Sequence, residues 1–143
     1  MAAPNTNPVY SFVGDVQWIT AMVTANNTLD ITSGTSYLAF TADATNGGYV
    51  REVRIKASPA NSTAATVFRI WLNNGSSTGT AANSILIGEL GVPATTTSAV
   101  NALPDFVYPL NFAMPPGYKI YLTMGTAPGG SGQFGAAVIG GKY

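Results

Sequence analysis

Short apolar runs separated by turn residues extend along most of the chain. Clusters of Ser, Thr, Asn, Gly and Pro recur between runs rich in β-branched and aromatic residues, which is the pattern of strands joined by turns. No window combines a helical period of apolar residues with capping residues at its ends. The pattern predicts about eight strands, at Val16–Thr24, Ser36–Ala42, Tyr49–Ala57, Ala65–Asn73, Ile85–Leu90, Phe106–Leu110, Tyr118–Gly125 and Gln133–Ile139.

Three of these runs alternate between two sets of side chains with a period of two. Successive side chains of a strand point to opposite faces, so each run should turn one set toward a core. One apolar and one polar face on each strand is typical of antiparallel sheets packed face to face. The residues expected to face inward are Val53, Ile55 and Ala57, then Phe68, Ile70 and Leu72, then Tyr118, Ile120, Leu122 and Met124.

The residues between the runs favour tight turns. Asn46-Gly47 and Asn74-Gly75 supply a positive φ at low cost, and Pro115-Pro116-Gly117 should turn the chain into the strand at Tyr118. Four further prolines fall where a strand ends or where an edge strand would tolerate a missing N–H, at Pro59, Pro93, Pro104 and Pro109. Together the strands and turns predict an all-β protein, an antiparallel β-sandwich of about eight strands that is jelly-roll-like.

The N-terminal segment lacks this strand pattern. We expect residues 1–15 to form an extended arm and residues 16–143 to form a single β-sandwich domain. Pro4 and Pro8 would then be candidate partner contacts on an arm that a neighbouring molecule orders, and the alternative is a terminus without a role. The segment resembles no signal peptide, and no apolar run approaches the ~20 residues of a membrane span, so we expect synthesis in a host cytoplasm and no membrane partner.

Charge is scarce along the whole chain. Charged residues make up 8% of the sequence, against about 25% in an ordinary soluble domain, and six basic residues balance six acidic ones. A neutral chain offers no electrostatic attraction for nucleic acid, so we expect no nucleic-acid partner. Low charge also removes the self-repulsion that keeps free proteins apart, which favours a place inside an assembly. The alternative is a Thr- and Asn-rich surface that stays soluble alone.

The residue types that most active sites need are missing or isolated. The sequence contains no cysteine and no histidine, which excludes the usual zinc sites and catalytic triads. The carboxylates occur singly, beside turns or on polar strand faces, so paired-carboxylate chemistry is not indicated. A calcium ion in the loop Asp43–Gly48 remains open, on the weak ground of one Asp. We therefore expect no enzymatic activity, no cofactor and no resident metal.

Arginine and tryptophan supply the candidate contact residues. Arg51 and Arg54 flank Glu52, which we expect to be a solvated or cross-strand ion-pair partner. Arg69 and Trp71 should share one strand face, and both residue types are enriched where interfaces bind most tightly. The alternative for Arg69 and Trp71 is a cation–π pair on an ordinary surface.

From about Tyr49 onward the chain resembles small proteins encoded in the head-gene modules of tailed bacteriophages. The stretches that carry the resemblance are Val50–Ile55 (VREVRI), Phe68–Gly75 (FRIWLNNG), Leu103–Asp105 (LPD) and Pro115–Tyr121 (PPGYKIY). The resemblance implies a virion location and a decoration, or cement, protein that stabilises the outer capsid surface. It also implies two kinds of partner, the major capsid protein and further copies of this chain, as a homotrimer.

Two other functions remain open at this point. One is a tail- or fibre-associated structural β-sandwich. The other is a carbohydrate-binding module, in which exposed aromatic rings stack on sugars. The candidate rings for such stacking are Trp18, Trp71, Tyr37 and Tyr121.

Overall fold

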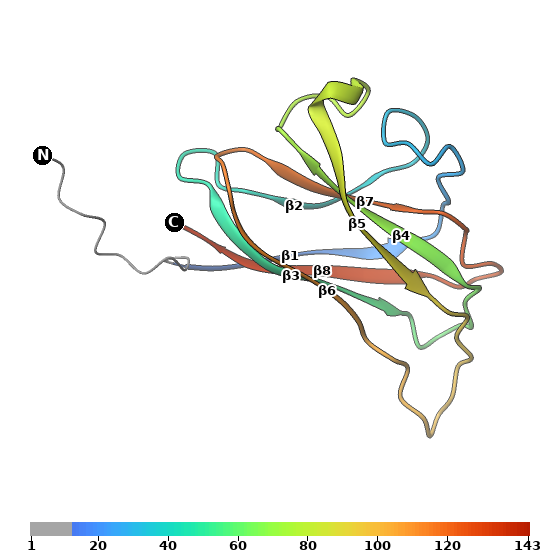
Figure 1. The fold of residues 1–143 in the computed structure, drawn as a ribbon. Coiled ribbons are helices and arrows are strands. Elements are labelled where there is room, and N and C mark those ends of the chain that lie inside the picture. Colours follow the sequence, from blue (N-terminus) through green and yellow to red (C-terminus); the bar gives the residue numbers. More distant parts are fainter. Residues whose placement is uncertain (1–12) are drawn as a thin grey trace, which may run out of the picture.

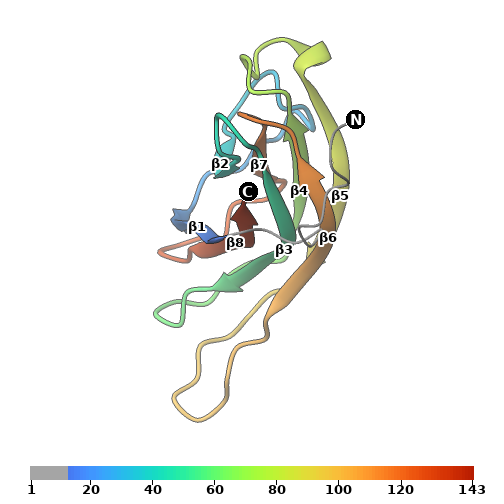
Figure 2. The same ribbon diagram turned by 90° about the vertical axis from the view of Figure 1, so that its left-hand side faces the viewer.

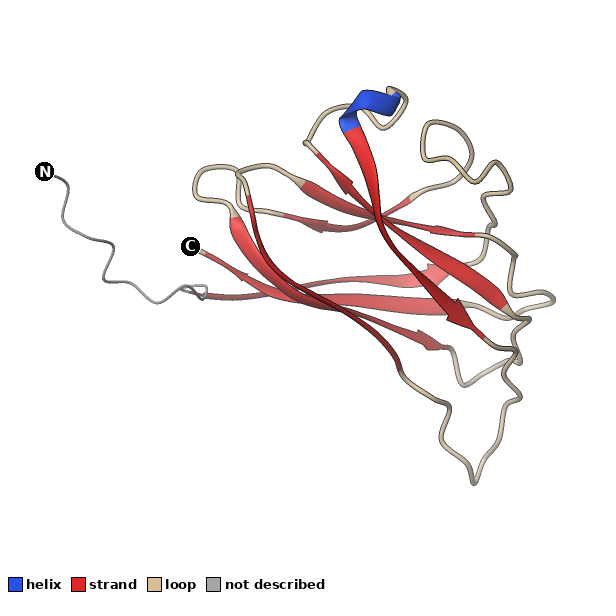
Figure 3. Cartoon of the chain, in the orientation of Figure 1, coloured by secondary structure: helices blue, strands red, loops and turns tan. Residues whose placement is uncertain are grey.

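The computed structural model describes residues 13–143, which form eight strands and one short 3-10 helix (Figures 1 and 3). The predicted contact residues Pro4 and Pro8, and most of the predicted arm, lie outside the described residues. The elements in chain order are β1 (Val13–Met22), β2 (Tyr37–Thr41), β3 (Gly48–Ala57), β4 (Thr66–Asn73), η1 (Ala81–Asn83), β5 (Ser84–Val92), β6 (Phe106–Met114), β7 (Lys119–Met124) and β8 (Phe134–Lys142).

The strands form two four-stranded antiparallel sheets that pack face to face (Figures 1 and 2). The strand order is β1-β8-β3-β6 in the first sheet and β2-β7-β4-β5 in the second. This interleaved order is the jelly-roll arrangement, in which consecutive strands alternate between the sheets for much of the chain. The prediction of an all-β, eight-stranded antiparallel sandwich is therefore confirmed.

All eight predicted strands are present, with differences at their ends. β1 begins at Val13, three residues before the predicted start, and β6 and β8 continue past the predicted ends to Met114 and Lys142. Strand ends are set by pairing with neighbours, which the local pattern does not contain. The 3-10 helix η1 lies in a loop where no helix was predicted, and it turns the chain into β5 (Figure 3).

The core lies between the sheets and follows the predicted alternation. Val53, Ile55 and Ala57 of β3 are buried, as are the inward residues Ile120, Leu122 and Met124 of β7. Phe68 and Phe134 meet at the centre with ring centroids 5.1 Å apart and ring planes at 84°, an edge-to-face contact between the two sheets.

Glycines and prolines shape the turns as predicted. Gly47 and Gly75 have φ of 77° and 94°, and a Cβ on Gly47 would lie 2.4 Å from the Met114 carbonyl oxygen. In the Pro115-Pro116-Gly117 turn, the Tyr118 N–H donates to the Pro115 carbonyl at 3.2 Å. Pro109 lies within β6, which is an edge strand, so its missing N–H interrupts no inner ladder.

The connection from β1 to β2, residues 23–36, is a long loop that the sequence pattern did not single out. Asn26 organises it: the side chain is 2% exposed, and its Nδ2 donates to the carbonyl oxygens of Asp30 and Ser33 at 2.8 and 2.9 Å. The Asn26 N–H also donates to the Met124 carbonyl at 2.6 Å, which fastens the loop to the end of β7. Gly34 packs against the Asn26 side chain with φ of 76°, where a Cβ would be crowded.

Candidate functional site on the outer face of the β1-β8-β3-β6 sheet

The strand register places a mixed apolar and charged surface on the outer face of the first sheet. One row across the four strands runs from Trp18 through Ala137 and Arg54 to Val107. The adjacent row runs from Val16 through Ile139 and Glu52 to Pro109. We call this surface the outer sheet face. It is apolar along β1 and β8, charged along β3 and apolar again along β6.

A bulge in β3 creates the charged part of the outer sheet face. Val50 pairs with Gly140 of β8 and Glu52 pairs with Ile139, so Arg51 is an extra residue between them. The bulge lets Val50 and Val53 both point into the core although three positions separate them, and it leaves Arg51 and Glu52 together on the outer side.

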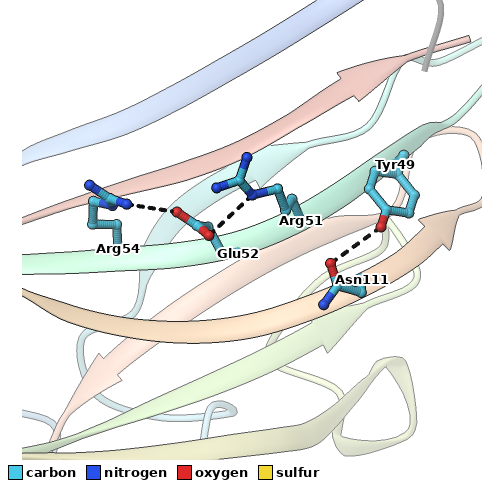
Figure 4. Close-up of polar contacts among 5 residues, drawn as sticks. All are labelled: Tyr49, Arg51, Glu52, Arg54 and Asn111. Carbon is cyan, nitrogen blue, oxygen red and sulfur yellow. Dashed lines mark hydrogen bonds and ion pairs between the residues drawn. The ribbon is translucent and has the colours of Figure 1, made fainter. Parts of the chain in front are cut away.

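Glu52 lies between two arginines of its own strand (Figure 4). Its Oε2 is 3.2 Å from Arg51 Nε and its Oε1 is 3.1 Å from Arg54 Nη2. The prediction that Glu52 is an ion-pair partner of these arginines is confirmed, but the prediction of a solvated or cross-strand pair is wrong. Glu52 is 8% exposed, and both ion pairs lie within β3. The arginine side chains, in contrast, are 60% and 46% exposed. The cluster thus fixes two guanidinium groups with one net positive charge, and this arrangement suits a partner that supplies a carboxylate.

Two neighbouring pairs extend the polar strip along β3. The Tyr49 hydroxyl donates to Asn111 Oδ1 of β6 at 3.3 Å (Figure 4). At the other end, Lys56 Nζ lies 2.7 Å from Asp105 Oδ1, and this ion pair lowers the pKa of the Asp105 carboxyl below its ordinary value. Polar contacts therefore join β3 to β6 at Asn111, and to Asp105 just before β6.

The apolar part of the outer sheet face was missed from the sequence. Trp18 is 69% exposed and Val16 is 48% exposed, on the same side of β1. Large apolar side chains at both inward and outward positions of one strand are the signal that could have revealed it, because a strand with one solvated face should be polar there. Exposed aromatic and aliphatic side chains beside a charged strip are typical of interaction surfaces.

Arg69 and Trp71, the other two predicted contact residues, lie on the second sheet and do not join Arg51 and Arg54. Arg69 Nε forms an ion pair with Glu89 Oε1 at 2.8 Å across β4 and β5. The Trp71 Nε1–H donates to Thr123 Oγ1 at 3.0 Å, and Trp71 is 9% exposed. Both side chains have little surface to offer a partner, and their contact role stays a prediction.

The four aromatic residues considered for sugar stacking differ in exposure and bonding. The Tyr37 hydroxyl accepts hydrogen bonds from the Val23 and Thr24 N–H groups at 3.1 and 2.9 Å, which ties it to the β1–β2 loop. Trp71 is committed to Thr123, and Tyr121 is half-buried. Trp18 alone among the four presents a largely open ring.

The carboxylates beside turns act on the backbone. Asp43 Oδ1 accepts from the N–H groups of Thr45 and Asn46 at 3.0 and 2.8 Å, and these bonds lower the pKa of Asp43. Asp30 is held in the same way by Thr32, chiefly by its hydroxyl, which lowers the pKa of Asp30. Residues 13–143 contain no group of three or more acidic side chains placed to hold a metal ion.

A hollow lies between β5 and β6. Its volume is about 400 Å³, and it is lined by Leu72, Ile87, Tyr108, Pro109, Leu110 and Phe112. The one hydroxyl in it, on Tyr108, donates to the Ile87 carbonyl at 3.2 Å. The hollow therefore offers apolar surface and no free chemical group. Within residues 13–143, no helix has the length and apolar character to cross a membrane.

Comparison with known proteins gives only weak structural similarity. No protein-family model matches the chain, and no curated protein does. Among solved structures, the chain is similar to a protein in the structure of infectious bursal disease virus, Gx strain, with a TM-score of 0.30 and 14% identity. The match covers 97% of this chain and 36% of that one, so the chain spans little more than a third of that protein's length. A likeness of this size says nothing about the function of this chain.

Proposed function

We propose that the chain is a structural virion protein that decorates and stabilises the outer surface of a phage capsid through protein–protein contacts. The observation that carries the proposal is the Arg51–Glu52–Arg54 cluster, set on a broad sheet face with exposed apolar residues on both sides. The face extends over four strands, which suits binding to another protein surface.

Three further features support the proposal. The chain resembles phage head proteins in the stretches from Val50 onward that were identified in the sequence. The jelly-roll strand order is an architecture found in viral capsid domains, and this is an argument by analogy of fold. The sparse charge fits a protein whose surface is covered by neighbours, because little repulsion opposes close packing.

The physical role in this proposal is stabilisation by occupancy. A protein that binds only the assembled shell shifts the equilibrium toward that shell, without any chemical step. The proposed partners are the major capsid protein, which would supply a carboxylate between Arg51 and Arg54, and further copies of this chain. Each arginine keeps donors that Glu52 does not use, so a second carboxylate can be bound without breaking the first pairs.

The test uses shells that lack the chain, together with the purified protein. Arg51→Ala/Arg54→Ala should lower co-sedimentation with shells by about tenfold or more, because charge-assisted bonds at an interface are lost. Leu38→Ala is the control, since Leu38 is 47% exposed on the second sheet. Equal binding by the arginine variant and the wild type would reject this face as the docking surface. Imaging of decorated particles then separates the capsid from the tail, and density only at the tail would favour the tail-associated alternative.

A carbohydrate-binding module is the second candidate, and the exposed ring of Trp18 is the observation that favours it. Jelly rolls also occur in lectin domains. In that case the wild-type chain would be retained on a polysaccharide column and Trp18→Ala would not. Absence of the chain from purified particles together with such retention would overturn the capsid proposal.

A further inference from the structure

β1 lies at one edge of the first sheet and pairs only with β8 among the described strands. A strand in this position has a row of backbone N–H and C=O groups on its second side, which is a template for another strand. Natural proteins block such edges with short strands, bulges, Pro or charged side chains. The edge strands of the two sheets are β1 and β6 in the first and β2 and β5 in the second.

Three of the four edges are blocked. β6 contains Pro109 and, at Asn111, a non-glycine residue with φ of 54°. β5 has a bulge at Ile87 and carries the charged Glu89. β2 has five residues and a register shift of its own. Each of these three edges is a poor template for an added strand.

The edge of β1 has none of these features over most of its length. Val13–Ile19 pairs with β8 without a register shift, and the stretch contains no Pro, Lys or Arg. Its single charged residue, Asp15, accepts a hydrogen bond from Gln17 Nε2 at 3.1 Å. The irregularity in β1 comes only between Ile19 and Met22. This is the longest regular edge among the described strands.

We propose that β1 pairs antiparallel with β1 of a second copy of this chain, so that two first sheets join into one eight-stranded sheet. An antiparallel pair of identical strands is closed by a two-fold axis and therefore forms a dimer. The side-chain pattern is self-complementary in this arrangement. Three registers are available, with Val16 opposite Val16, Val16 opposite Trp18, or Trp18 opposite Trp18. None of the three brings Asp15 opposite Asp15.

This pairing also accounts for the exposure of Val16 and Trp18. Their exposed fractions in the single chain are 48% and 69%, and cross-strand contact would cover them. The two-fold axis of an antiparallel pair is perpendicular to the sheet, so both outer sheet faces point the same way. If the proposed capsid role is right, the two Arg51–Arg54 clusters then bind the shell together, which raises the overall affinity without new contacts. The pairing itself does not depend on that role.

The association state of the purified full-length chain tests the pairing without any shell. Sedimentation over a concentration series should show a monomer–dimer equilibrium for the wild type. Val16→Lys and Trp18→Lys should each raise the dimer dissociation constant about tenfold or more, because two symmetric cross-strand contacts are lost. Leu38→Lys is the matched control, since Leu38 is on edge strand β2 with an exposure of 47% against 48% for Val16. A monomer at all concentrations, a trimer, or unchanged dimers in the β1 lysine variants would overturn the proposal.

Cross-linking gives a second readout that does not depend on affinity. The sequence has no cysteine, so any disulfide involves only introduced residues. Directly opposed residues of an antiparallel pair lie within disulfide reach. Val16→Cys alone, Trp18→Cys alone, or the two mixed should form disulfide-linked dimers on mild oxidation, and which one does so gives the register. The pairing would be contradicted if none of these three samples formed more disulfide-linked dimer than a Leu38→Cys control. Monomers in solution with shell binding lost in Val16→Lys would instead assign the β1 edge to a capsid strand.

Discussion

The Gln17 side-chain amide binds the backbone of Thr41 with two hydrogen bonds. Gln17 Nε2 donates to the Thr41 carbonyl at 2.9 Å, and the Thr41 N–H donates to Gln17 Oε1, also at 2.9 Å. The side-chain amide of Gln17 thus makes the two hydrogen bonds with Thr41 of β2 that a neighbouring strand's backbone would make. These bonds connect β1 of the first sheet to β2 of the second sheet. Gln17 joins the two sheets on the side of the sandwich that carries the proposed dimer edge.

Gln17→Met should therefore destabilise the fold while conserving side-chain size. The Thr41 N–H and carbonyl lose their partners at a half-buried position, and we expect a cost of about 1–2 kcal/mol in the free energy of unfolding. Urea unfolding of the two proteins measures the difference. A change below about 0.5 kcal/mol would mean that water replaces both bonds at no cost.

The other side of the sandwich is closed by Tyr108 against a bulge in β5. A Cβ on Gly88 would lie 2.3 Å from Cζ of Tyr108, so Gly88→Ala should cost about 1–3 kcal/mol through overpacking. Gly91→Ala in the same strand is the control, because a Cβ there has no atom within 4 Å. Adding Tyr108→Ala should cost less in the Gly88→Ala background than alone, and strictly additive losses in thermal unfolding would argue against the clash.

The bond between Trp71 and Thr123 makes a separate prediction. Thr123→Val conserves the shape of the side chain but leaves the buried Trp71 Nε1–H without its acceptor, at a cost of about 1–3 kcal/mol. A double-mutant cycle with Trp71→Phe isolates the bond, because the second change removes the donor. A coupling energy indistinguishable from zero in chemical denaturation would contradict the assignment.

Acid should destabilise the protein below about pH 4, because the pKa values of Asp30, Asp43 and Asp105 are lowered from 3.8 in the folded state. The unfolded chain binds these protons more readily, so the stability that the carboxylates give is present above the unfolded pKa. It is lost as the pH falls through the folded values.

Thermal unfolding against pH measures this dependence. The sequence has no histidine, so the unfolding temperature should change little between about pH 5.5 and 8. Asp43→Asn keeps an acceptor for the N–H groups of Thr45 and Asn46 but removes the titrating proton. The unfolding temperature of this variant should fall less below about pH 4 than that of the wild type. An identical fall in both proteins would show that Asp43 does not contribute to the acid dependence.

The sequence predicted the strands well because alternation is a local signal. Phe68, Ile120 and Leu122 could be placed in the core from their neighbours alone. Strand pairing could not be predicted in the same way, and Glu52 shows the consequence. The bulge at Arg51 depends on the register with β8 and β6, and it places Arg51 out of simple alternation, beside Glu52 on the outer side.

The candidate site was predicted only in part. Arg51 and Arg54 were identified as a local concentration of charge, but the exposed Val16 and Trp18 lie about 35 residues earlier and meet them only through β8. Trp71 followed the alternation as an outward residue, yet its burial depends on Thr123, which is 52 positions away. Contacts of this range are set by the fold, so residue types and spacing alone could not show them.

Purified virus particles test most directly the proposal that this chain lies on the outer surface of a virion. Particles of the virus that encodes it should be purified, inventoried by mass spectrometry and imaged with and without the chain. A decoration protein should be present in many copies per particle, with density on the outside of the shell, and shells lacking the chain should rupture at a lower temperature. Absence of the chain from the particles, or density confined to the tail, would contradict it.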